Sequence, residues 1–270
     1  MSNLPVELQR EIFEIAVRSN YKDAALKLKL SLVAHHVHFW VDTVFYEIVM
    51  ILGEASGAEF VELIDSKPSG FFGPVVKSLL LIGVGASICA RILSKCTGIQ
   101  SFAWWVLGRD DPTLAASQLP LQRLGLAFRD LAFLIAAHPP PIWLATLTHL
   151  ETSISERSDG DLKQLRLFPR LTHVSLYAPK HSDSYAQMVI DNCPNLQILG
   201  MTLGTRDAAV ATAVSLADSR IVVVLPDSIN RPFEDWEAAH FGLPNLWTRA
   251  EDVLTERKRL ATLEQSIDEK

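Results

Sequence analysis

The chain has 270 residues, of which 49% are hydrophobic and 21% charged, so it can bury a large core and is not expected to be disordered. A formal net charge of −6 and a pI of about 5.8 argue against a nucleic-acid-binding protein, which usually carries a basic patch. The most apolar stretch, between Lys77 and Arg91, holds 13 residues, too few to span a bilayer.

The first residues lack the basic and then apolar pattern of a signal peptide. Cys89, Cys96 and Cys193 cannot all pair and form no C-x-x-C motif, so we expect reduced cysteines in the core. Together these features predict a cytoplasmic or nuclear protein that binds neither a membrane nor nucleic acid.

Residues 1–46 predict two or three short helices. Asn3 can cap the first helix and Pro5 suits its first turn. Leu8 and Ile12 then follow at helical spacing, and a second apolar set extends over residues 26–45. Helices this short are not stable alone, so we expect them to pack on the next element.

Two motifs stand in order in this segment: Leu4-Pro5-x-Glu7-Leu8-x-x-x-Ile12-Phe13, and then Leu30-Ser-Leu32-Val33 with Trp40. Together they resemble the F-box, in the version found in many fungal F-box-like proteins with leucine-rich repeats. The resemblance implies binding to a Skp-type adaptor of a cullin-RING ubiquitin ligase. The adaptor-binding residues that it implies are Leu4, Pro5, Leu8, Ile12, Phe13 and Val33. The alternative is that residues 1–46 only cover the first repeat, because repeat arrays need capping ends.

The histidines at 35, 36 and 38 are not expected to bind a metal. Metal-binding pairs on helices usually stand at positions i and i+4, and these three residues do not. The sequence therefore predicts no metal site.

From residue 47 to 226, large apolar residues recur at relative positions 0, 3 and 5, as in the L-x-x-L-x-L of a leucine-rich repeat. The third positions are 22 to 26 residues apart, within the range of about 20–29 for such repeats. They are Leu81, Trp104, Leu126, Thr152, Leu176, Met201 and Val223, with the copy at Thr152 degraded and the last one shortened. Tyr46–Leu52 alternates as a strand that starts the sheet.

A helical return is expected after each strand. The returns are Phe60–Ile64, Ile88–Leu93, Leu131–Ile135, Leu162–Leu165, Tyr185–Val189 and Val210–Leu216, while Gly83-Val-Gly85 is expected to form a turn. The predicted fold is an α/β leucine-rich-repeat solenoid, a horseshoe with a parallel sheet on its concave side. An F-box-like helical cap (1–46) and a C-terminal helical cap (227–270) flank the repeat domain (47–226).

Alternate strand residues should face the concave surface. These are mostly small and apolar, and they include Trp105, Glu151 and Tyr177, the candidate substrate-binding residues. The alternative for Trp105 is burial under a neighbouring loop or the C-terminal segment. We expect Trp236 and Trp247 of that segment to seal the last repeat, and Thr248 to cap its final helix.

No motif of a hydrolase, metalloprotease or nucleotide-binding enzyme is present, so neither catalytic residues nor a cofactor are predicted. The favoured function is a non-catalytic substrate receptor of an SCF-type ubiquitin ligase, which binds the adaptor through its helices and an unknown protein substrate through its repeats. The alternative is a leucine-rich-repeat scaffold unconnected with ubiquitination.

Overall fold

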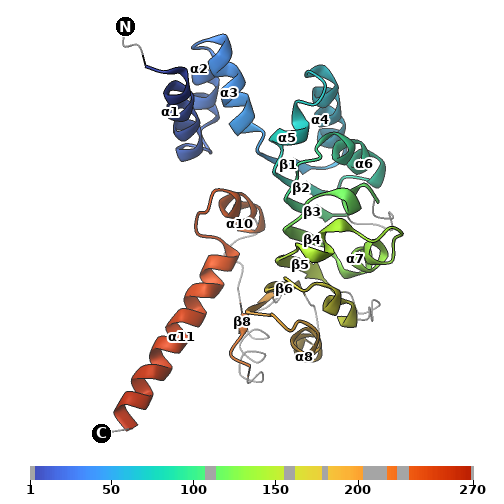
Figure 1. Ribbon diagram of the computed structural model, residues 1–270, viewed down its shortest axis with the longest axis vertical. Coiled ribbons are helices and arrows are strands. Elements are labelled where there is room, and N and C mark those ends of the chain that lie inside the picture. The colour runs from blue at the N-terminus through green and yellow to red at the C-terminus, as the bar shows by residue number, and fades with distance from the viewer. Residues whose placement is uncertain are drawn as a thin grey trace.

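The computed structural model describes residues 4–106, 114–154, 162–177, 182–202, 218–223 and 231–268. In this part of the chain, eight strands form one sheet in which every adjacent pair is parallel and the strands follow one another in chain order (Figure 1). They are β1 (Ile48–Leu52), β2 (Ser78–Ile82), β3 (Ser101–Trp105), β4 (Arg123–Ala127), β5 (His149–Ser153), β6 (His173–Tyr177), β7 (Ile198–Thr202) and β8 (Ile221–Val223). The prediction of an α/β fold with one parallel sheet is confirmed.

The strands pair in the register that the recurring triplet predicts. Its third positions lie side by side across the sheet, from Leu81 beside Trp104 to Met201 beside Val223. These side chains point into one core between the sheet and the helical returns, where Leu81 and Leu176 are completely buried. Each strand therefore covers the apolar side chains of the strand before it.

The returns lie on the outer side of the sheet (Figure 1). They are α4 (Glu54–Ser66), α5 (Phe72–Val75), α6 (Ala86–Lys95), α7 (Phe128–Ile135), α8 (Ser182–Asn192) and the 3-10 helices Leu114–Gln118, Ile142–Ala145 and Leu162–Leu167. The return at Leu162–Leu165 is thus a 3-10 helix and not an α-helix, and the one at Val210–Leu216 lies outside the described residues. Gly83 forms the expected turn, with φ +66°, and its N–H donates to the carbonyl of Trp105.

Three helices precede the sheet: α1 (Val6–Ser19), α2 (Ala24–Ser31) and α3 (His35–Phe45). Asp23 caps α2 by accepting a hydrogen bond from the N–H of Leu26 at 2.8 Å. The three helices share a small core of their own, formed by Val17, Val37, Trp40, Val41 and Val44.

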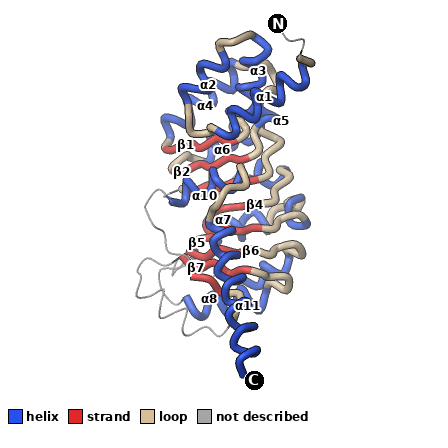
Figure 2. Tube along the Cα trace, turned by 90° about the vertical axis from the view of Figure 1, so that its left-hand side faces the viewer, coloured by secondary structure: helices blue, strands red, loops and turns tan. Residues whose placement is uncertain are grey.

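The C-terminal helices α10 (Arg231–His240) and α11 (Leu246–Asp268) lie on the face of the sheet opposite the returns, here called the inner face. Figure 2 shows both helices in front of the strands, and the end of α11 extends beyond the sheet. Asn245, rather than the predicted Thr248, caps α11, because its Oδ1 accepts from the N–H of Trp247 at 2.9 Å. The Thr248 hydroxyl accepts in turn from the N–H of Asn245.

Leu176→Ala should lower the free energy of unfolding by about 2–5 kcal/mol, because a fully buried leucine leaves a cavity that the neighbouring repeats share. Chemical denaturation measures this loss. Leu167→Ala, at a half-exposed position, is the matched control and should change stability far less. Equal stability of Leu176→Ala and the parent chain would contradict the shared core.

Thr152→Val should raise the free energy of unfolding by about 1 kcal/mol. Thr152 is 0% exposed, and its hydroxyl has no hydrogen-bond partner in the described part of the chain. Valine has the same shape without a polar atom to bury, so the midpoint of thermal unfolding should increase. A lower midpoint would mean that the hydroxyl is satisfied by a bound water.

Candidate functional site

The inner face is largely covered by the C-terminal helices. Trp236 of α10 is 4% exposed and packs on Leu80 of β2 and Ala103 of β3. Trp247 of α11 packs at the other end of the sheet, in a cluster with residues of β7 and β8. The expectation that both tryptophans seal the last repeat is therefore wrong for Trp236, which lies near the start of the sheet.

A pocket of about 340 Å³ opens on the inner face beside α10. Its lining combines alternate residues of the strands with two aromatic residues of α10: Leu80, Ile82, Trp105, Glu151, Ser153, Tyr177, Phe233 and Trp236. We call it the inner pocket. The structure thus brings together Trp105, Glu151 and Tyr177, the three residues that strand alternation selects as candidates.

The aromatic walls of the inner pocket touch one another. The rings of Trp105 and Tyr177 lie edge to face, with centroids 6.0 Å apart and planes at 71°. Both side chains are half-buried, so the contact leaves part of each ring facing the pocket. Trp105 also packs against the cluster around Trp236, which agrees in part with its expected burial by the C-terminal segment.

Glu151 is the acidic group of the inner pocket. Its ion-pair partner is Arg123, whose Nη2 lies 3.7 Å from Oε1, beyond hydrogen-bond distance. The Arg123 guanidinium lies 5.2 Å from the centroid of the Trp236 ring, and its Nε has no hydrogen-bond partner among the described residues. Burial raises the pKa of Glu151, and the Asp235 carboxylate adds to that rise, although Arg123 opposes it.

Two stacked histidines lie beneath α11. His149 of β5 and His173 of β6 are neighbours across the sheet, and their rings stack with centroids 4.3 Å apart. The planes of both rings lie at a steep angle to the ring of Trp247, at 73° for His149 and 87° for His173. His173 Nε2 is 3.4 Å from Glu251 of α11. Burial lowers the pKa of His149 to about 3, helped by the nearby positive charges of His173 and Arg123.

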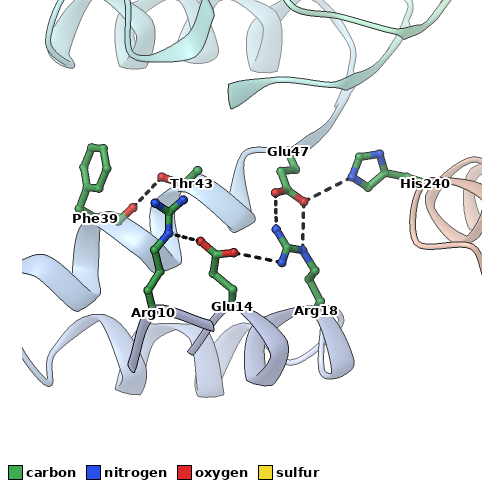
Figure 3. Close-up of polar contacts among 7 residues, drawn as sticks. All are labelled: Arg10, Glu14, Arg18, Phe39, Thr43, Glu47 and His240. Carbon is green, nitrogen blue, oxygen red and sulfur yellow. Dashed lines mark hydrogen bonds and ion pairs between the residues drawn. The ribbon is translucent and has the colours of Figure 1, made fainter. Parts of the chain in front are cut away.

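A polar joint connects the N-terminal helices, the sheet and α10 (Figure 3). Glu47 accepts a hydrogen bond from Arg18 of α1 at 2.7 Å, and its other carboxylate oxygen lies 3.6 Å from Nε2 of His240 in α10. The main-chain carbonyl of Glu47 accepts from the N–H groups of Lys77 and Ser78. Burial alone would raise the pKa of Glu47, but the contacts with His240 and Arg18 outweigh it and lower that pKa.

The residues implied by the F-box resemblance are mostly exposed apolar side chains. Leu8 is 45% exposed, Ile12 55% and Val33 60%. Leu4 and Pro5 are exposed as well, but Phe13 is half-buried against Trp40, with ring centroids 6.4 Å apart. Further exposed apolar residues are Val6 and Ile15 of α1, Leu28 of α2, and Leu32, which directly follows α2.

Metal-binding side chains do not gather in the described residues. No group of three or more His, Cys, Asp or Glu side chains there could hold a metal ion. The three cysteines are free and buried, and burial raises the pKa of each thiol to about 12, which keeps them unreactive.

None of the helices in these ranges is both long enough and apolar enough to cross a membrane. Comparison with known proteins found no matching family profile, no matching curated protein and no matching solved structure.

Between about pH 6.5 and pH 3 the chain should lose stability as the pH falls. The unfolded His149 takes up a proton near pH 6.5, whereas the folded one resists it until about pH 3, so protons favour unfolding in this window. The slope is at most about 1.4 kcal/mol per pH unit for one histidine. Denaturation at several pH values measures it. His149→Phe should flatten the slope, and an unchanged slope would contradict the assignment.

Proposed function

We propose that this chain is a non-catalytic substrate receptor of an SCF-type cullin-RING ubiquitin ligase, acting in the cytoplasm or nucleus. In this proposal α1–α3 form an F-box-like domain that binds a Skp-type adaptor. The repeats are of the leucine-rich type, and their inner face binds a protein substrate. The proposal rests on the sequence motifs, and one structural observation supports it above others.

That observation is the exposure of apolar side chains on α1 and just after α2. The small core of these helices is already filled by Val17, Val37 and Trp40. Leu8, Ile12 and Val33 add nothing to it and face outward. In this proposal these side chains form one apolar surface, as is typical of a protein–protein interface. A helical segment that only capped the first repeat would not need exposed apolar side chains at positions 8, 12 and 33.

The inner pocket supports the second half of the proposal. Aromatic side chains dominate the energetics of protein interfaces, and here Trp105 and Tyr177 stand partly accessible at a concave site. The C-terminal helices cover part of the inner face, and the inner pocket opens beside α10. A small anchoring segment of a substrate is therefore a better fit than a broad flat contact.

The second candidate is a repeat scaffold without any link to ubiquitination. Two observations favour it. The residues after Val33 are Ala34-His35-His36-Val37, where the F-box usually has Cys-Lys/Arg-x-Trp. The joint at Glu47 also ties the helices to the sheet and to α10, as an N-terminal cap would be tied. The two candidates differ in whether the exposed surface binds the adaptor.

Adaptor capture by the purified chain tests the proposal. The parent chain should bind a Skp-type adaptor at micromolar concentration, and Leu8→Asp or Ile12→Asp should weaken binding by at least about tenfold, because each places a charge in an apolar interface. Both residues are exposed, so the thermal unfolding midpoint should hardly change. Leu260→Asp on α11, at an equally exposed leucine, is the matched control and should bind like the parent. A folded parent chain that captures no adaptor would leave the scaffold as the function.

A further inference from the structure

The inner pocket has the chemistry of a site for an organic cation. Four of its lining residues are aromatic: Trp105, Tyr177, Phe233 and Trp236. The face of an aromatic ring carries partial negative charge and attracts cations, most strongly when water is excluded. One cation–π contact of this kind is already present, since the Arg123 guanidinium lies over the ring of Trp236. The same walls would serve a cation that enters from solvent.

The acidic group of the inner pocket is at ion-pair distance from its partner but is not hydrogen-bonded to it. The Glu151 side chain is 17% exposed, and its partner Arg123 reaches it at 3.7 Å and not at hydrogen-bond distance. A buried carboxylate is stabilised by donors that carry positive charge, because these give the strong charge-assisted hydrogen bonds. A ligand with an N–H-bearing cation would meet both the rings and this carboxylate.

The remaining lining residues indicate what kind of chemical group the cation of the ligand is attached to. Leu80 and Ile82 present aliphatic surface, which matches an aliphatic stem rather than a second polar group. A volume of about 340 Å³ is at the small end of ligand pockets, so it suits one side chain or a small amine. A lysine side chain combines a flexible aliphatic stem with a compact ammonium group.

We infer that the inner pocket binds the protonated amine of a lysine-type side chain of the protein substrate, with the ammonium donating to Glu151 and lying against Trp105 and Tyr177. That the side chain belongs to a protein substrate rests on the proposed function. The binding chemistry rests on the pocket alone.

Titration of the full chain with two small probes tests the inference. Nα-acetyl-lysine methylamide carries the charge, and Nα-acetyl-norleucine methylamide has the same type of stem without it. The NMR signals of the indole N–H groups report binding at Trp105 and Trp236. The lysine probe should bind at least about tenfold more tightly than the norleucine probe. Glu151→Gln should abolish most of this preference, and Trp105→Leu should weaken binding of the lysine probe.

Phe133→Leu is the matched control, because Phe133 is an exposed aromatic residue of α7 on the outer side of the sheet, and it should leave both affinities unchanged. If the norleucine probe binds as tightly as the lysine probe, the pocket is an apolar site and the inference is wrong. It is equally wrong if neither probe shifts the indole signals at about 10 mM. The adaptor is absent from this experiment, so its outcome is independent of adaptor capture.

Discussion

The structure depends on one constraint: a single strand with its return cannot bury its own apolar side chains. Only the next strand, in the right register, covers them, and the sheet therefore extends in chain order from β1 to β8. The constraint acts on position more than on residue type. Thr152 stands where the other repeats place a leucine, a tryptophan, a methionine or a valine, and it is still completely buried, because its neighbours Leu126 and Leu176 fix the strand between them.

The inner face of the sheet is covered in a different way, by the C-terminal helices and not by the returns. Its side chains are exposed by the strand alternation, and the C-terminal helices return across the molecule to cover them. Trp236 and Trp247 are the anchors of this return, one near each end of the sheet. The joint at Glu47 then links α10 to α1 and to the first strands. The N-terminal helices, the repeats and the C-terminal helices thus contact one another through α10, although they lie far apart in the sequence.

The inner pocket forms where strand residues of the inner face meet α10. Strand alternation alone predicts that Trp105, Glu151 and Tyr177 share one face, because the period of two is a property of every strand. It does not predict Phe233 and Trp236, which complete the lining from a helix. Their spacing of three residues indicates one helix face, but no local pattern states which surface that face covers. No local pattern indicates Arg123 either, because its contact with the Trp236 ring depends on where α10 lies.

By itself, the sequence determined the strands, their parallel order and most of the returns, because a repeated apolar triplet has only its own copies to pack against. It also determined which strand residues point away from the core. Only the tertiary structure decided that α10 and α11 cross the inner face and leave a pocket there, and that Leu8 and Ile12 of α1 face outward. These outcomes depend on contacts between segments far apart in the chain, and such contacts leave no periodic trace in the sequence.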